Sequence, residues 1–497
     1  MRDWLYRLCF LIAFCIGCGG QDTTPDATPE PRLDSGSADT GPADAEPGTT
    51  PEDAMAPDAP TPDAEIMSRC GDGITDTERG EECDDGNDND EDTCSNACII
   101  RYNCPRRPTI CDGASPTVSE HRLSELDPCA FTLVPEPLSE TEARASVISD
   151  LAESLGPPLD VSDILTDLNR SGQNGVTNQT STRLRNHRWR GFNWDDGDSE
   201  VDYWYPQGVT GSSDATASGS IDGQRVMMVS WYHRTDERPT KGARISIANT
   251  SDRTRVRYRH VLLVEPFRSA GIAQFRAANV ESGDALHAGG IVWFGRYLYV
   301  ADTRSGFRLY DLEQIMRVTH TDQKSRIGMT GTRADAHGYQ YIVPEVLRYV
   351  TPEDSCPIKF SFAGLDRGSA PPTILTGEYQ TPEVSGRVAA WTLDPSSGLL
   401  DVRDGEVRAV RAAATGQSRM QGALTWDGVF YISSSSQYSR WGRLYRTTPG
   451  RESRYSAWVY GCEDLYYERD TGVIWTAAEF PDFRDVVGIP MPSLSAE

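Results

Sequence analysis

One strand pattern recurs in the second half of the 497-residue chain. The segment HAGGIVWFGRYLYVADT (287–303) aligns with RMQGALTWDGVFYISSS (419–435), and Gly290 falls on Gly422. Each copy places a small or polar residue before a short apolar strand, then a turn with glycine, then a second apolar strand. Segments from 205 and from 461 follow the same order with longer turns. Such self-similarity is typical of repeat architectures, so we expect several similar small sheets.

The repeat predicts an all-β domain over residues 186–497, folded as a β-propeller. Because a blade takes ~40–50 residues, we expect about six blades, with five or seven as alternatives. The innermost strand of a blade starts at the central channel, where glycine lets neighbouring backbones approach closely. A pair of β-sandwiches is the competing fold, but it explains four openings of one form less readily.

The residues just before the inner strands form the candidate ligand-binding site. In a propeller, they would form a ring at one end of the channel. They are Gln207, His287, Gln421, Glu463 and Asp464. All are polar, and histidine is the side chain best suited to act as acid, base or metal ligand near neutral pH. The alternative role of these side chains is structural, as caps on the backbone of the next blade.

Two functions fit such a ring. The favoured one is non-catalytic binding of a protein, polysaccharide or small ligand, and we assign no catalytic residue. The alternative is a metal-dependent hydrolase or lactonase, in which Glu463, Asp464 and His287 surround a metal that activates water. Among the clear repeats, no other inner strand is preceded by an acidic residue, so such a metal would have too few ligands. No GxSxG motif supports a serine hydrolase.

Five blocks of this region carry a resemblance to known proteins. They are YWYPQGVTGSSDA, YRHVLLVEP, HAGGIVWFGRYLYVADTRSGFRLYDL, SRMQGALTWDG and EDLYY followed by VIWTAAEFP. In this order they resemble a group of functionally uncharacterised, secreted β-propeller-like proteins of soil actinobacteria, over residues 190–490. The resemblance implies a propeller fold and export, and it assigns no site residue.

The N-terminus has the pattern of an export signal. Two arginines precede an apolar run (8–16) that is too short to span a membrane. The end of the run, CIGC, resembles the lipobox of bacterial lipoproteins, which implies lipidation of Cys18 after removal of residues 1–17. A plain secretory signal is the alternative. The predicted location is therefore the bacterial cell envelope, with a lipid anchor at the outer membrane or cell surface, or else the medium.

Residues 18–66 are rich in proline and acidic residues, with one basic residue and no aromatic one. This segment has too little apolar surface to offset its ordering entropy, so we expect a disordered tether. The acidity of the chain, −26 overall, is concentrated before the propeller, because residues 131–497 hold 46 acidic and 39 basic residues. That near balance argues against nucleic-acid binding. The expected partners are a membrane, through the anchor, and a protein or polysaccharide, while the oligomeric state stays open.

Residues 67–130 hold seven of the twelve cysteines. In an exported chain this density indicates a disulfide module, and the absence of a CxxC pair there argues against zinc. The run of CGDGITD, GEECDDGN and DTCSNAC resembles the cysteine-rich repeat of myxobacterial surface and secreted proteins, which implies compartment and lineage more than function. The predicted disulfide cysteines are Cys70, Cys83, Cys94, Cys98, Cys104, Cys111, Cys129, Cys356 and Cys462. We expect the first four to bridge among themselves and Cys356 to be able to pair with Cys462. Because nine is odd, at least one stays free or pairs between chains.

The acidic loop CDDGNDNDEDTC (83–94) is a candidate calcium site. Calcium takes about six to eight oxygen ligands, and the proposed ones come from Asp84, Asp85, Asn87 and Asp90. A solvated acidic turn between disulfides is the alternative.

Residues 131–185 predict a short helical segment that packs on the propeller. Ser139 and Glu142 have the spacing of a capping box, and Gly156 ends the helix.

Overall fold

The computed structural model describes residues 121–381, 384–435 and 441–494, and residues 71–73, 75, 81, 83, 84, 86, 87, 94 and 98. The chain divides into two units, Met1–Ile66 and Met67–Glu497, and all described residues belong to the second. The expected signal peptide, Cys18 and the expected tether lie outside the described residues.

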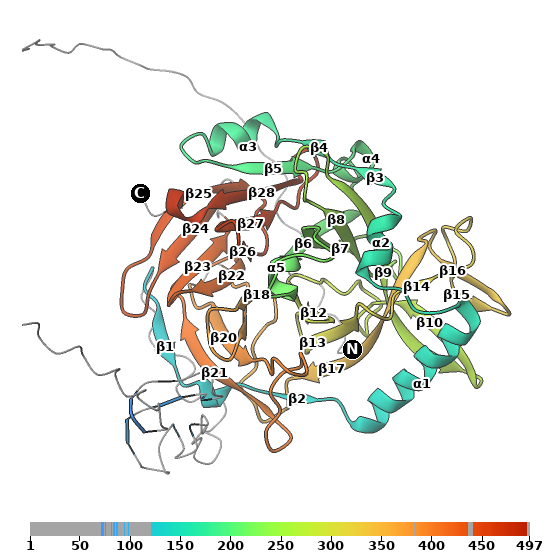
Figure 1. Cartoon of the computed structure of the whole chain (residues 1–497), viewed down its shortest axis with the longest axis horizontal. Coiled ribbons are helices and arrows are strands. Elements are labelled where there is room, and N and C mark those ends of the chain that lie inside the picture. Colours follow the sequence, from blue (N-terminus) through green and yellow to red (C-terminus); the bar gives the residue numbers. More distant parts are fainter. Residues whose placement is uncertain are drawn as a thin grey trace, which may run out of the picture. The chain divides into compact units, whose positions relative to one another are not determined.

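The second unit is built around five antiparallel sheets of four strands each, which we number as blades 1 to 5 (Figure 1). Blade 1 holds β6 (Trp204–Gly211), β7 (Val226–His233), β8 (Ala243–Asn249) and β9 (Arg257–Ser269). Blade 2 holds β11 (Ile291–Phe294), β12 (Tyr297–Asp302), β13 (Gly306–Asp311) and β17 (Tyr341–Val350). Blade 3 holds β18 (Phe362–Asp366), β19 (Thr373–Gly377), β20 (Arg387–Thr392) and β21 (Val407–Ala414). Blade 4 holds β22 (Met420–Trp426), β23 (Val429–Ser434), β24 (Trp441–Thr447) and β25 (Arg454–Tyr460).

Blade 5 joins the two ends of the domain. Its inner three strands are β26 (Tyr466–Glu468), β27 (Val473–Ala477) and β28 (Asp485–Pro490). Its outer strand is β5 (Arg190–Asn193), which comes from the start of the domain and pairs with β28. This pairing closes the ring of blades, since the first and last segments share one sheet.

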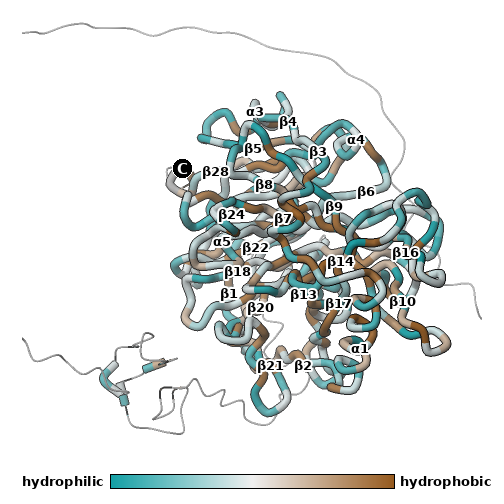
Figure 2. Tube along the Cα trace, turned by 45° about the vertical axis from the view of Figure 1, so that its right-hand side comes forward, coloured by the Kyte–Doolittle hydropathy of each residue, from teal (hydrophilic) through white to brown (hydrophobic). Residues whose placement is uncertain are grey.

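Apolar side chains fill the space between neighbouring blades. Five buried clusters are found, one for each pair of adjacent blades around the ring. Trp293, for example, packs with residues of blade 1, and Trp475 packs with Trp231 of blade 1 in the cluster that closes the ring. Each blade is thus covered on both faces, and Figure 2 shows apolar residues along the strands and more polar ones in many of the outer loops.

The structure has five blades where about six were expected. Long insertions explain the difference, because they make the blades longer than the ~40–50 residues of a standard repeat. In blade 1, β9 continues into the hairpin partner β10 (Ile272–Ala277). In blade 2, β14 (Met316–Arg317) and the hairpin of β15 (Ile327–Thr330) and β16 (Arg333–Ala336) lie between β13 and β17.

The segment before the propeller packs on its periphery. Strand β1 (Ser124–Leu126) pairs with β21, β2 (Thr132–Pro135) pairs with β17 and β21, and β3 (Arg170–Ser171) pairs with β9. The remaining elements are a 3-10 helix (Pro128–Ala130), β4 (Gln173–Asn174), α1 (Leu138–Leu155), α2 (Val161–Thr166), α3 (Asn178–Arg183), α4 (Asp196–Ser199), α5 (Ser212–Ala215) and α6 (Met491–Leu494). None of the helices in the described ranges has the length and apolar character needed to cross a membrane.

Helix α1 confirms the predicted helix but not its predicted cap. Val147, Ile148 and Leu151 are buried on one face, and the helix ends at Gly156. The capping box was wrong: Pro137 is the N-cap residue and no side chain caps the helix, so Ser139 lies inside the first turn. An ion pair between Arg144 and Glu136 ties the start of the helix to the preceding strand instead.

Candidate functional site

Glycines bring the inner strands of neighbouring blades into direct contact. A Cβ on Gly290 would lie 1.9 Å from the backbone N of Ala363, and a Cβ on Gly422 would lie 2.6 Å from the Cα of Asp464. Side chains cannot come this close to backbone, so these positions require glycine. The close approach predicted for both glycines is confirmed, and its consequence is that the inner strands of neighbouring blades pack backbone against backbone at this level.

Asp464 lies where these strands meet. The side chain is fully buried, and its Oδ2 accepts the N–H groups of Val209 in blade 1 (3.4 Å) and Ile291 in blade 2 (3.2 Å). Burial raises the pKa of this carboxyl well above its usual value, although neighbouring backbone N–H groups act in the opposite direction. Asp464 must therefore be corrected from a ligand candidate to a structural residue, because its carboxyl group already holds two blades together.

Helix α5 lies in the middle of the ring and follows the end of β6 that is remote from Gln207 (Figure 1). Two arginines hold its carbonyl groups: Arg367 Nε donates to Asp214 O at 2.8 Å, and Arg469 Nη2 donates to Ser213 O at 2.9 Å. The Asp214 side chain is buried and accepts the hydroxyl of Thr210, and burial raises its pKa to about 7. This end of the axis is thus occupied by the chain itself.

A cavity of about 880 Å³ lies over the other end of the inner strands. Every blade contributes a polar side chain to its lining. These side chains are Gln207 from blade 1, His287 from the approach to blade 2, Ser361 from the approach to blade 3, Gln421 from blade 4 and Glu479 from blade 5. The structure therefore brings together three of the five predicted residues, Gln207, His287 and Gln421.

Glu463, the fourth predicted residue, lies directly behind Gln421. It is only 2% exposed, and its Oε1 accepts the side-chain N–H of Gln421 at 3.2 Å. Burial raises the pKa of Glu463 well above its usual value, and the charges of Glu479 and Asp464 raise it further. This shift favours the neutral form of the carboxyl, in which it can donate a hydrogen bond.

His287 faces the cavity and is exposed to it, although it lies deep among surrounding atoms. Its ring packs against Tyr232 with centroids 4.4 Å apart. Desolvation in this position, and next the charge of Arg234, lower the pKa of His287 to about 4. The lowered pKa leaves a neutral imidazole with one donor and one acceptor.

Most of the charged groups in the walls are paired. Three ion pairs involve cavity residues. They are Arg387 with Glu378, Arg308 with Asp302, and Arg238 with Asp284. Two cations remain: Arg304 is exposed and has no ion pair among the described residues, and Lys359 Nζ makes a 3.4 Å contact with Gln380 Oε1.

Sequence reasoning missed the acidic positions of the wall. Asp302, Glu378 and Glu479 each lie at or just after the end of the second strand of a blade, and all three line the cavity. The segments VADT, TGEYQ and AAEFP carry this recurrence. Extending the repeat alignment to the end of the second strand would have found them.

The described part of the cysteine-rich segment contains the disulfide Cys83–Cys94, as predicted. Cys98, Cys129 and Cys356 are also disulfide-bonded. Cys70, Cys104 and Cys111 lie outside the described residues. The prediction for Cys462 was wrong: this thiol is free and buried. It packs between blades 4 and 5, whereas Cys356 belongs to the cluster between blades 2 and 3, so the two do not meet.

The acidic loop uses Asp84 to hold its own backbone. The two carboxylate oxygens accept N–H groups from Gly71, Asp72, Gly73 and Gly86 at 2.8 to 3.1 Å. Desolvation raises the pKa of Asp84, but these four bonds outweigh it and lower the pKa. A calcium ion would have to compete with these donors for the same oxygens.

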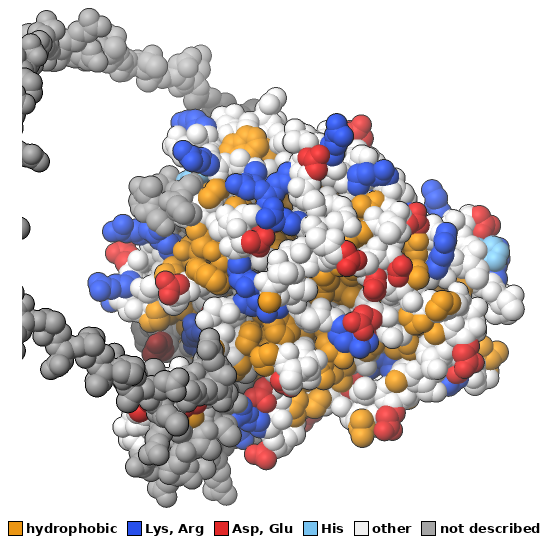
Figure 3. Space-filling view, in the orientation of Figure 1, with side chains coloured by type: hydrophobic (Ala, Val, Ile, Leu, Met, Phe, Trp, Pro, Cys, Tyr) orange, Lys and Arg blue, Asp and Glu red, His pale blue; other side chains and the backbone are white. Residues whose placement is uncertain are grey.

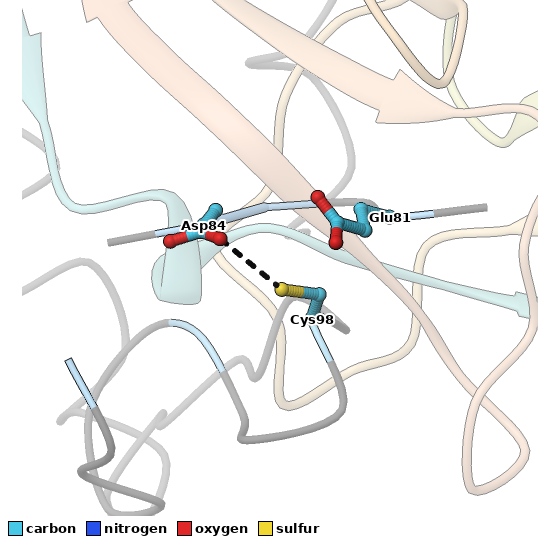
Figure 4. Close-up of side chains that lie close together, drawn as sticks. All are labelled: Glu81, Asp84 and Cys98. Atoms are coloured by element: carbon cyan, nitrogen blue, oxygen red, sulfur yellow. Dashed lines mark hydrogen bonds between the residues drawn. The ribbon is translucent and has the colours of Figure 1, made fainter. Parts of the chain in front are cut away.

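Glu81, Asp84 and Cys98 bring three ligand-type atoms within 4.8 Å of one another (Figure 4). Cys98 is in a disulfide and offers no thiolate. The cluster therefore lacks one of the three ligands that a metal would need from it. Asp85 and Asp90 of the proposed calcium set lie outside the described residues, and Asn87 is exposed.

A buried Ser–His–Asp chain lies inside blade 1. Ser246 Oγ is 2.9 Å from His260 Nδ1, and His260 Nε2 is 2.9 Å from Asp198 Oδ2. All three side chains are buried, and the Ser246 hydroxyl also accepts the indole N–H of Trp231 at 2.7 Å. With its hydroxyl bonded on both sides and away from solvent, Ser246 is a structural residue rather than a nucleophile.

No protein-family model matches the chain, and no curated protein matches it in sequence. Among solved structures, a hydrazine synthase of Kuenenia stuttgartiensis is 9% identical, with 56% of this chain and 75% of that chain covered and a TM-score of 0.26. A GH43_1 enzyme of Xanthomonas citri is 8% identical (62% and 92% covered, TM-score 0.27). The β-xylosidase RS223 is 9% identical (57% and 91% covered, TM-score 0.28). At these identities and TM-scores the likenesses are distant and assign neither family nor activity.

Proposed function

We propose that the propeller binds a saccharide, without catalysis, in the cavity over its inner strands. One observation carries this proposal: all five blades place a polar side chain at one cavity of about 880 Å³, while the buried Asp464 side chain and helix α5 occupy the axis beneath it. That volume is within the ~300–1,000 Å³ range of small-ligand sites. Because the chain occupies the axis, the cavity is closed at its inner end and does not continue through the ring of blades.

The chemistry of the floor suits hydroxyl groups. The amides of Gln207 and Gln421 each carry donors and an acceptor, and the neutral His287 ring adds one of each. Glu463 lies behind Gln421 and orients its amide by accepting the side-chain N–H at 3.2 Å. Sugar hydroxyls both donate and accept hydrogen bonds, so a floor of mixed neutral groups matches them without the cost of burying an unpaired charge.

The alternative, a metal-dependent hydrolase or lactonase, fits these residues less well. It requires Glu463, Asp464 and His287 around one ion. Asp464 instead faces the backbone of blades 1 and 2, and Glu463 is bonded to Gln421. His287 alone would leave a metal with too few protein ligands for a catalytic site, which usually has three.

We also propose that this protein acts at the bacterial cell envelope, anchored through a lipid on Cys18 and held off the membrane by residues 18–66. The support is the lipobox-like CIGC and the acidic, proline-rich composition that follows it. The cysteine-rich repeat and the five ordered blocks add a resemblance to exported bacterial proteins. Replacement of Cys18 by alanine should move the protein from the detergent phase to the aqueous phase, and unchanged partitioning would refute lipidation.

Calorimetry with the mature full-length chain and a panel of neutral and acidic oligosaccharides tests the binding function. Gln421→Ala and His287→Ala should each weaken the binding of any hit by about 5- to 30-fold, since each removes one or two hydrogen bonds of the floor. Gln323→Ala, on the loop near the β15–β16 hairpin, is the matched control and should change nothing. Unchanged binding in both cavity variants would contradict the proposed site. If binding requires added Ca²⁺ or Zn²⁺, the result would favour the metal-dependent alternative.

A further inference from the structure

The two unpaired cations of the cavity lie on one wall. Arg304 belongs to the turn between β12 and β13, and Lys359 belongs to the segment between β17 and β18. The backbone N–H of Phe360 donates to the carbonyl of Thr303 at 3.2 Å, which places these two segments side by side. Both residues line the cavity, so the wall formed by blades 2 and 3 contributes a guanidinium and an ammonium group to it.

The acidic groups of the same wall do not neutralise them. Glu378 is bonded through both oxygens to Arg387, and Asp302 is bonded to Arg308. Two further carboxyl groups near the cavity, Glu463 and Glu479, come from blade 5 and not from blades 2 and 3. The cavity is thus polarised, with positive charge on one wall and carboxyl groups at another.

We propose that the ligand is an acidic saccharide, with a carboxylate or sulfate group bound by Arg304 and Lys359 and its hydroxyl groups bound by Gln207, Gln421 and His287. This inference rests on the proposed function and adds to it the class of saccharide. A guanidinium and an ammonium group on one wall suit an anionic group on a sugar, because charge-assisted hydrogen bonds are shorter and stronger than neutral ones.

The cations also have the accessibility that this role requires. Both side chains are exposed, and neither supports a strand or an interblade cluster. Replacing them therefore changes the charge of the wall without removing packing, which lets binding be separated from folding.

The test uses the mature full-length chain and three matched pairs of probes. These are oligomers of galacturonate, glucuronate and mannuronate, each as the free acid and as its methyl ester. For at least one pair, the acid should bind about tenfold more tightly than the ester or better, a difference of 1.4 kcal/mol in binding free energy. The double variant Arg304→Gln with Lys359→Gln should lose this difference and keep its affinity for the ester. Arg255→Gln, an exposed arginine on the turn before β9, is the charge-matched control and should keep the preference.

Salt gives a second readout. Binding of the acid should weaken between 50 and 500 mM NaCl, a range that shortens the screening length from ~14 to ~4 Å, whereas binding of the ester should not. Equal affinity for acid and ester, or a preference for a zwitterionic dipeptide that bridges the two walls, would overturn the acidic-saccharide inference and leave the cavity as a binding site. Failure of every neutral and acidic saccharide to bind would overturn the proposed function itself.

Discussion

Replacing Asp464 by alanine should destabilise the whole propeller. This residue belongs to blade 5, and its side chain accepts hydrogen bonds from blades 1 and 2. The substitution leaves the buried N–H groups of Val209 and Ile291 without their acceptor. A buried donor without a partner costs about 1–3 kcal/mol, so the two together cost about 2–6 kcal/mol. The raised pKa of Asp464 indicates that burying this carboxyl is itself costly, and relief of that cost offsets part of the loss. We therefore expect a decrease of about 2–4 kcal/mol in the free energy of unfolding.

Calorimetry of the mature chain with its disulfides intact measures this effect. Unfolding entropy is about 2.1 cal/mol/K per residue, or roughly 0.8 kcal/mol/K for a domain of about 370 residues, so Tm should fall by about 3–5 °C. Asp464→Asn keeps an oxygen acceptor and should lose less than half as much. Asp202→Ala, at an exposed position, is the control and should stay within about 1 °C. An Asp464→Ala protein with an unchanged Tm would refute the structural role of this carboxyl.

Three further perturbations test other parts of the structure. Gly290→Ala should lower Tm by more than about 10 °C or prevent folding, because its Cβ would lie 1.9 Å from the backbone N of Ala363; Gly197→Ala, where the nearest atom is 3.4 Å away, should fold normally, and similar behaviour of the two would show that the strands can separate. Asp214 has its pKa raised to about 7 by burial, so its contribution to stability is greatest below about pH 4, where the unfolded chain is protonated too, and is lost as the pH rises towards 7. Asp214→Asn should therefore show a flatter decline in Tm between pH 4 and 8 than the natural chain, and parallel curves would contradict the raised pKa. Cys462 should resist maleimide in the folded protein, since it is buried and its pKa is raised to about 12, and should react once the unreduced chain is unfolded; labelling of Cys462→Ala to the same extent would place the free thiol elsewhere.

The site residues that could be predicted from sequence are those at equivalent positions of the repeated blades. Gln207 and Gln421 each precede the glycine of an inner strand, and the same position in blade 5 holds Glu463. A repeated backbone puts equivalent positions at equivalent places around the ring, so these side chains converge. Alignment within one chain was enough to find them.

Asp464 departs from the pattern for a physical reason. It occupies the position that is glycine in Gly208, Gly290 and Gly422, where a side chain points into the crowded axis. The axis has room for one such side chain, and blade 5 supplies it as the acceptor for its neighbours. Both Glu463 and Asp464 are polar, so residue type alone did not show that Asp464 points into the axis while the position before it lies towards the cavity.

Two other features depend on distances that no local pattern contains. The blade count was overestimated because hairpins such as β15–β16 lengthen the blades without adding new ones. The free state of Cys462 follows from its place between blades 4 and 5, remote from the cluster of Cys356 between blades 2 and 3. On the face drawn in Figure 3, basic, acidic and apolar side chains are mixed.

A crystal structure of the mature chain with the tightest-binding oligosaccharide of the panel tests the central claim most directly. We predict a sugar ring over the inner strands, with hydroxyl oxygens within about 2.7–3.2 Å of the side chains of Gln207 and Gln421. A sugar bound on the outer surface, with an empty cavity, would contradict the proposed function.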